Sequence, residues 1–159
     1  MSSEENKALM RHFYEEVFNQ KNVAAIDDFL APTFVNHSAS QLGLTAGDLE
    51  HVTQFVSMVM QTFPDLHYTV EDLIAEGDKI AARFTISGTQ HGTFLGIPPT
   101  GTHATVSDIE IFRITGGKAV EAWVQVDFLG LLQQLGAIPP PARASYQGIG
   151  VRGSGKDAA

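Results

Sequence analysis

The sequence has no cysteine, few basic side chains and no long hydrophobic run. Its 159 residues include 10 Lys and Arg against 18 Asp and Glu, a formal net charge of -8. The missing cysteine excludes disulfide scaffolds, thiolate zinc sites, iron-sulfur clusters and cysteine nucleophiles. The acid excess argues against nucleic acid as a partner, because that affinity rests on Lys and Arg neutralising phosphates. It argues equally against an anionic membrane surface.

The lack of a hydrophobic run bears on where the protein works. No stretch approaches the roughly 20 apolar residues of a membrane-spanning helix, and the acidic start, MSSEENK, is unlike a signal peptide. We therefore expect a cytoplasmic protein with no membrane partner. The length predicts one domain over residues 1–138, and the Pro-, Gly- and Ala-rich residues 139–159 are expected to form a disordered tail.

Hydrophobic periodicity predicts helices in the first part of the chain and strands in the second. Apolar residues recur at helical intervals over residues 4–19, 23–30 and 45–63. After Asp65 the period becomes two, which predicts strands over residues 66–75, 79–89, 103–114 and 119–127, and a last short helix over 128–135. This order is typical of an α+β fold with the helices packed on one face of an antiparallel meander.

Several stretches together resemble the SnoaL-like polyketide cyclase family. They are Phe34-Val-Asn-His37, residues 88–101 (GTQHGTFLGIPPTG), and the ending with Ile111–Lys118, Glu121-Ala-Trp123 and Asp127–Gly136. The resemblance covers roughly residues 8–138. It implies a nuclear-transport-factor-2-like fold, in which a strongly curved mixed sheet and the three N-terminal helices form a cone around a pocket. Fold likeness alone does not fix the reaction.

The resemblance also implies a chemistry. Cyclases of this family close a polyketide ring by an intramolecular aldol step without metal or organic cofactor. Such a step needs a base beside a carbonyl, a donor for the enolate oxygen and a dry pocket. We therefore expect a cofactor-independent polyketide cyclase-like enzyme acting on a small apolar or polycyclic carbonyl compound. The alternatives are a hydratase or hydroxylase relative, and a non-catalytic protein that binds small hydrophobic ligands.

The candidate catalytic residues are carboxylates on the last two strands: Asp108, Glu110 and Asp127. A two-residue turn at Gly116-Gly117 would put all three on one face of the hairpin, together with Trp123. A three-residue loop with a glycine bulge would instead place Asp108 and Glu110 with Val124 and turn Asp127 to the other face. The sequence leaves both registers open, and with them the choice between pocket carboxylates and solvent-facing residues.

Two positions on the last strand carry separate expectations. The resemblance places the family's acid/base aspartate nearer Val124 than Asp127, which implies that this chain lacks that group at its usual position. Asp127 immediately precedes Phe128-Leu-Gly-Leu-Leu. An Asp there can cap a helix N-terminus by accepting its free N–H groups, so a cap and a catalytic acid/base are equally consistent with the pattern.

The expected ligand-binding residues come from several elements: His37, Arg83, His91, Trp123, Val124, Phe55 and Phe112. The two histidines lie at strand ends and could donate to an enolate oxygen, or only satisfy a backbone carbonyl. Arg83 and Trp123 fit packing roles as well as pocket roles. No metal site is expected, because the histidines show no ligand spacing. Apolar side chains on both faces of the last hairpin predict a homodimer through the outer face of the sheet.

Overall fold

The structure, a computed structural model, describes residues 1–142. Its helices are α1 (Ser3–Phe13), which continues as a π-helix (Tyr14–Asn19), a 3-10 turn (Val23–Ala25), α2 (Ile26–Phe29), a 3-10 turn (Ala39–Leu42), α3 (Leu49–Thr62) and α4 (Phe128–Gln134). Its strands are β1 (Leu30–Asn36), β2 (His67–Glu76), β3 (Lys79–Thr89), β4 (His103–Thr115) and β5 (Lys118–Val126). The four strands predicted after Asp65 are confirmed to within one or two residues at their ends.

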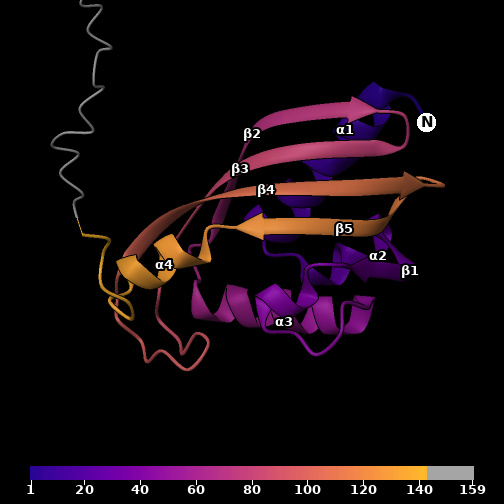
Figure 1. Cartoon of the computed structure of the whole chain (residues 1–159). Helices are drawn as coiled ribbons and strands as arrows, with labels where there is room; N and C mark the ends of the chain where they lie inside the picture. Colours follow the sequence, from indigo (N-terminus) through magenta and orange to yellow (C-terminus); the bar gives the residue numbers. More distant parts are fainter. Residues whose placement is uncertain (143–159) are drawn as a thin grey trace, which may run out of the picture.

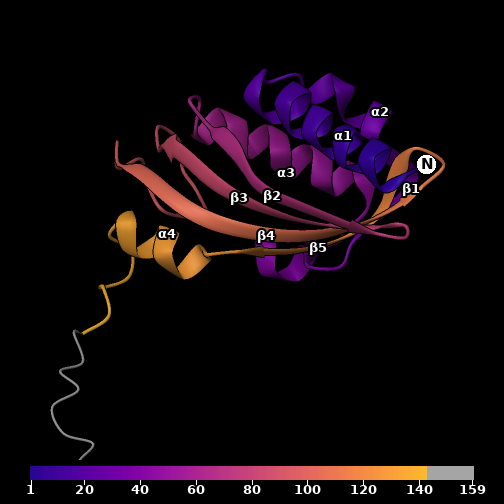
Figure 2. The ribbon, with the colours of Figure 1, turned by 90° about the horizontal axis from the view of Figure 1, so that it is seen from above.

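The strands form one mixed sheet in the order β1-β5-β4-β3-β2. Strand β1 runs parallel to β5, and every other neighbouring pair is antiparallel. The long strands bend around α1, α2 and α3, which lie together on one face of the sheet (Figures 1 and 2). Helix α4 follows β5 at the end of the sheet away from the N-terminus. The α+β class and the curved mixed sheet expected from the resemblance are confirmed.

The N-terminal helices differ in detail from their predicted bounds. The first turns into a π-helix at Tyr14, which widens the helix so that Phe13, Tyr14, Val17 and Phe18 are all buried. The second ends at Phe29, because Leu30 begins β1, which contains Pro32. The third begins only at Leu49, where the Asp48 side chain accepts the backbone N–H of His51. Tertiary pairing and capping therefore override the helical periodicity at these ends.

A β-bulge decides the register of the β4-β5 hairpin. At the turn, Ile114 pairs with Ala119 and Thr115 with Lys118, which is the two-residue connection through Gly116-Gly117. The register then shifts between Arg113 and Ile114, so that Glu110 pairs with Val124. The hairpin thus has the two-residue turn of the first predicted register, but Asp108 and Glu110 share a face with Val124 as in the second. The cause is the extra residue Val120, which has no partner on β4.

The bulge sorts the hairpin side chains between two faces. Phe112, Ala122 and Val124 point into the core together with Asp108 and Glu110, and all five are buried.

Within residues 1–142, none of the helices is both long and apolar enough to cross a membrane. The part of the expected tail from residue 143 onward lies outside the described residues.

The start of α4 generates a prediction. Asp127 Oδ1 accepts the backbone N–H of Gly130 at 2.8 Å. Replacing Asp127 by Ala removes this cap and should lower the free energy of unfolding by about 0.5–2 kcal/mol in urea denaturation. Asp127→Asn is the matched control, because Asn caps as well as Asp, and it should retain the wild-type stability. Equal losses in both variants would contradict the cap.

Candidate active site

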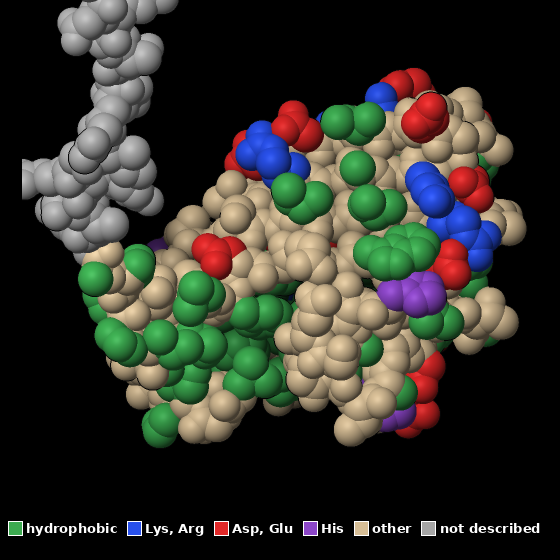
Figure 3. Space-filling view, in the orientation of Figure 1, with side chains coloured by type: hydrophobic (Ala, Val, Ile, Leu, Met, Phe, Trp, Pro, Cys, Tyr) green, Lys and Arg blue, Asp and Glu red, His purple; other side chains and the backbone are tan. Residues whose placement is uncertain are grey.

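Two adjoining cavities lie between the helices and the inner face of the sheet. The apolar chamber has a cavity volume of about 70 Å³, and its lining includes the aromatic residues Phe55, Phe63, Tyr68, Phe94 and Phe128. The carboxyl chamber has a cavity volume of about 80 Å³, and its lining includes Tyr14, Asn36, Tyr68, Glu110 and Val124. Both are lined by Phe55, Tyr68 and Val126, so they meet at these side chains. Figure 3 shows apolar side chains gathered over α4 and the neighbouring loop, beside a hollow in the surface.

The carboxyl chamber contains a buried pair of acids on one strand. Asp108 and Glu110 stand two residues apart on β4, so both side chains point to the inner face. Asp108 is 1% exposed and Glu110 is 7% exposed. Tyr14, the first residue of the π-helix, donates its hydroxyl to Glu110 Oε2 in a short hydrogen bond. Three polar groups from two distant segments thus meet among apolar side chains.

Burial controls the protonation of these acids. It raises the pKa of Glu110 well above the ordinary value, and the negative charge of Asp108 raises it further, while the hydrogen bond from Tyr14 lowers it. Burial also raises the pKa of Asp108. Neither oxygen of Asp108 has a hydrogen-bond donor among residues 1–142. The neighbouring Glu110 side chain offsets part of this rise in the pKa of Asp108.

Three of the residues expected to contact a ligand lie on the cavity surface. Phe55 comes from α3 and lines both chambers, while Phe112 and Val124 line the carboxyl chamber. Val124 stands directly opposite Glu110 on the neighbouring strand. Their side chains share a face, and directly opposed Cβ atoms in such pairs lie about 4.5–5.5 Å apart. A carboxyl group is therefore present beside the position where the resemblance places the family's aspartate, but it comes from β4.

Four other expected ligand-binding residues are absent from the cavity lining. Arg83 is exposed on the outer face of the sheet, and its Nε donates to Asp72 Oδ2 at 2.7 Å. His91 is exposed, and its backbone N–H bonds to the carbonyl of Thr62. Side chains alternate along β3, and the inward positions belong to Ala82 and Phe84. Arg83 lies between them and therefore points away from the cavity.

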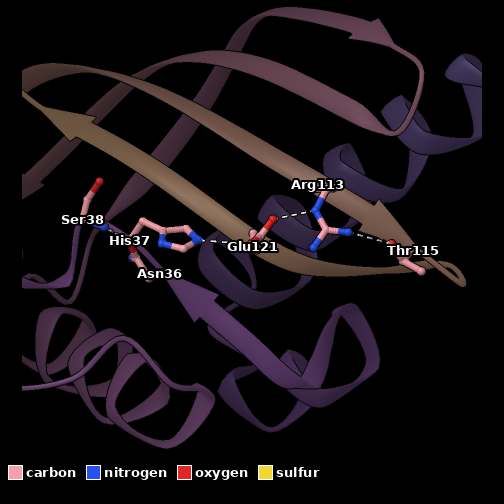
Figure 4. A network of polar contacts seen from close by, with 6 residues as sticks. All are labelled: Asn36, His37, Ser38, Arg113, Thr115 and Glu121. Atoms are coloured by element: carbon pink, nitrogen blue, oxygen red, sulfur yellow. Dashed lines mark hydrogen bonds and ion pairs between the residues drawn. The ribbon is translucent and has the colours of Figure 1, made fainter.

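The other two form a cluster on the outer face of the sheet. The His37 ring stacks on Trp123 with centroids 4.8 Å apart. His37 Nε2 lies 3.3 Å from Glu121 Oε1, and Arg113 Nε donates to Glu121 Oε2 at 2.5 Å (Figure 4). The bulge at Val120 turns Glu121 and Trp123 outward, which is why this cluster lies on the opposite face from Glu110.

Asp127 is exposed at the N-terminus of α4 and does not line either chamber. Its hydrogen bond to the N–H of Gly130 confirms that it caps the helix. A Cβ at Gly130 would lie 2.2 Å from Asp127 Oδ2, so this cap geometry leaves room only for glycine at position 130. The cap by itself accounts for an Asp at this position.

Two tyrosines of the site were not anticipated. Tyr14 and Tyr68 fit ordinary apolar stripes in the sequence, and only their hydroxyl groups distinguish them from core phenylalanines. A buried tyrosine hydroxyl needs a polar partner, so two tyrosines on predicted inward faces were the signal that could have indicated a polar interior.

Among residues 1–142, no group of three or more His, Asp or Glu side chains is arranged to hold a metal ion.

Comparison with known proteins bears on the family of this chain. The profile of the SnoaL-like polyketide cyclase family matches residues 8–135, which is most of the chain. The chain belongs to the SnoaL-like polyketide cyclase family. The nogalonic acid methyl ester cyclase of Streptomyces nogalater is 28% identical over 120 residues, covering 75% of this chain and 89% of that enzyme. Family membership agrees with the resemblance found in the sequence.

Solved structures of Streptomyces proteins share the fold closely. TsrD from Streptomyces laurentii is 33% identical with a TM-score of 0.78, covering 87% of this chain and 99% of TsrD. AclR from Streptomyces galilaeus, a candidate hydroxylase, is 29% identical with a TM-score of 0.78, covering 87% of this chain and 100% of AclR. The chain thus shares its fold with both proteins.

The buried acid pair predicts an unusual pH dependence of stability. Because the pKa of Glu110 is raised on folding, the folded state holds a proton that the unfolded state releases above the ordinary Glu pKa of about 4.3. The contribution of Glu110 is therefore fully present below that pH and is lost as the pH rises through the raised pKa. Urea denaturation between about pH 5 and pH 8 should show the free energy of unfolding falling less steeply in Glu110→Gln than in the wild type. Parallel curves would contradict this account.

Proposed function

We propose that this protein is a cofactor-independent ring-closing enzyme in which Glu110 is the general acid/base. The observation that supports this most directly is the position of Glu110, buried in the carboxyl chamber and opposite Val124. A raised pKa brings a carboxyl group toward the working pH, where it can both take and return a proton. The acid/base group that the resemblance places near Val124 on the last strand is, in this proposal, supplied by Glu110 of the neighbouring strand β4.

The proposed step needs only proton transfer within one substrate. The Glu110 carboxylate removes a proton from the carbon beside a carbonyl, and the resulting enolate carbon attacks a second carbonyl carbon of the same molecule. One carbon-carbon bond forms, and the new alkoxide takes the proton back from Glu110. Asp108 disfavours ionisation of Glu110 by its charge, and Tyr14 favours it by donating a hydrogen bond. The hydrogen bond from Tyr14 therefore offsets part of the rise in the pKa of Glu110.

The apolar chamber supports the substrate class. Its lining is almost entirely aliphatic and aromatic, and it includes Phe55 of α3, Phe63 just after α3, Val106 and Phe128. Such a chamber favours a flat, largely apolar body and excludes water from the reacting carbon. An apolar or polycyclic carbonyl compound fits this description, and the Streptomyces nogalater relative is named for its action on nogalonic acid methyl ester.

Proton abstraction can be measured before the natural substrate is known. In D2O, the wild type should accelerate exchange of the protons beside the carbonyl of 2-tetralone, a bicyclic ketone, as followed by NMR. Glu110→Gln should lower that rate, and the rate of closure of nogalonic acid methyl ester, by about 10²–10⁴-fold, the usual contribution of a positioned acid/base. Binding of 2-tetralone should be nearly unchanged, because Gln has the same shape.

The matched control makes the same chemical change on the other face of the hairpin. Glu121→Gln removes a carboxylate that bonds to Arg113 and His37 outside the cavity, and it should leave the exchange rate unchanged. A wild type that binds 2-tetralone without accelerating exchange would contradict catalysis and favour a binding protein. Full activity in Glu110→Gln would contradict the role of Glu110.

We propose in addition that two copies pair through the outer face of the sheet. Ile109 is 52% exposed and Ile111 is 40% exposed in the middle of this face. Ile111 lies between Ala81 and Trp123 on the neighbouring strands, and Figure 3 looks onto the outer face of the sheet. Ion pairs of Arg113 with Glu121 and of Arg83 with Asp72 flank the apolar strip. An apolar centre with a charged rim is the usual anatomy of a protein interface.

A charge in the strip should prevent pairing. The wild type should sediment as a dimer in analytical ultracentrifugation, whereas Ile109→Glu/Ile111→Glu should sediment as a folded monomer, because pairing would bury the new charges. Leu129→Glu is the control, since Leu129 is 58% exposed but lies on α4, and it should remain dimeric. A monomeric wild type would exclude this interface.

A further inference from the structure

The two tyrosines beside the acid pair differ in what their hydroxyl groups do. Tyr14 uses its hydroxyl to hold Glu110. The main chain of Tyr68 bonds to the side chain of Asn19, and within residues 1–142 its hydroxyl engages no acceptor. Tyr68 is half-buried and lines the cavity, so this hydroxyl is free to donate to a group that enters it.

Tyr68 stands where the two chambers meet. It lines the apolar chamber and the carboxyl chamber, in which Glu110 also lies. Its ring packs against those of Tyr14 and Phe18 with centroids 5.1 Å and 4.5 Å away, and against Phe84 at 5.7 Å. Strand β2 carries it, opposite Ile86 of β3. Packing on several sides leaves the ring little freedom, so its hydroxyl is a preorganised group.

We propose that the Tyr68 hydroxyl is the hydrogen-bond donor to the enolate oxygen of the substrate. This role rests on the proposed function, because an enolate forms only if Glu110 removes the neighbouring proton. It places the reacting carbonyl at the junction of the chambers, with the apolar body of the substrate among the aromatic side chains and the acidic carbon beside Glu110. In the step, the oxygen gains negative charge while Tyr68 keeps its proton.

The electrostatics of the site suit a neutral donor. Burial raises the pKa of Tyr68 well above its ordinary value, and the charges of Glu110 and Asp108 raise it further. The phenol therefore stays protonated and keeps its proton available to donate. A donor fixed in an apolar setting stabilises charge that develops in the transition state without reorganising solvent. Tyr68 would thus act on the oxygen while Glu110 acts on the carbon.

The experiment measures the donor without requiring turnover. An acidic, nitro-substituted 2-naphthol binds as its naphtholate, which mimics an enolate oxygen on an apolar body, and naphthalene matches its shape without the oxygen. Tyr68→Phe keeps the ring and removes only the hydroxyl. It should weaken naphtholate binding by about 10–100-fold, the usual loss for a hydrogen bond to a charged group, and leave naphthalene binding within about 2-fold. Isothermal titration calorimetry gives both affinities.

Tyr14→Phe is the matched control from the same aromatic cluster. It should not lower the ratio of naphtholate to naphthalene affinity, because the hydroxyl of Tyr14 is engaged by Glu110. Because the hydrogen bond from Tyr14 lowers the pKa of Glu110, its loss should move the pH profile of 2-tetralone exchange to higher pH. Tyr68→Phe should lower the exchange rate by about 10²–10³-fold without that shift, as for loss of one oxyanion donor.

The outcomes separate the donor from the acid/base. Equal weakening of naphtholate and naphthalene in Tyr68→Phe, or no change in either, would overturn the donor role and leave only packing. Undiminished exchange in Glu110→Gln would overturn the proposed function, yet a changed naphtholate ratio in Tyr68→Phe would still identify a carbonyl-oxygen subsite at Tyr68. The two proposals therefore fail by different measurements.

Discussion

The β-bulge at Val120 is the constraint on which the interior of this protein depends. It inserts one residue between a tight turn and the long pairing of β4 with β5. Side chains alternate along a strand, so this single residue exchanges the faces of β5 relative to the turn. Val124 is thereby brought opposite Glu110 inside the cone, and Trp123 is left outside. Without the bulge, the acid pair would share its face with further charged and polar groups rather than with an apolar wall.

Burial of the resulting acid pair costs free energy, and the same burial gives the two carboxyl groups raised pKa values that are chemically useful. An apolar surround disfavours ionised carboxylates, which raises the pKa of Glu110 and Asp108. Tyr14 compensates in part by donating to Glu110. A buried group maintained at such a cost is a common mark of a functional site. The outer carboxylates show the contrast, because Glu121 is held by Arg113 and its pKa is lowered.

The two proposed roles of the protein, action on a ligand and pairing with a second copy, fall on opposite faces of the sheet. The inner face is covered by α1, α2 and α3 (Figure 2), and it lines the two chambers and carries Glu110. The outer face carries an apolar strip with Ile109 and Ile111 between ion pairs, suited to a second copy of the chain. Because neighbouring residues of one strand point to opposite faces, β4 serves both tasks at once. A substitution at one face can therefore be read largely independently of the other.

The sequence by itself determined the α+β class, the places of the four long strands, the family and the presence of carboxylates on the last hairpin. These follow from local periodicity and from contiguous motifs, which a single chain displays directly. Only the tertiary structure decided that Glu110 and Asp108 enter the cavity, that Asp127 caps a helix and that His37 and Arg83 stay outside. Those outcomes depend on a one-residue register shift and on partners distant in sequence, such as Tyr14. Neither leaves a local pattern, since inward and outward positions look alike until the pairing strand is known.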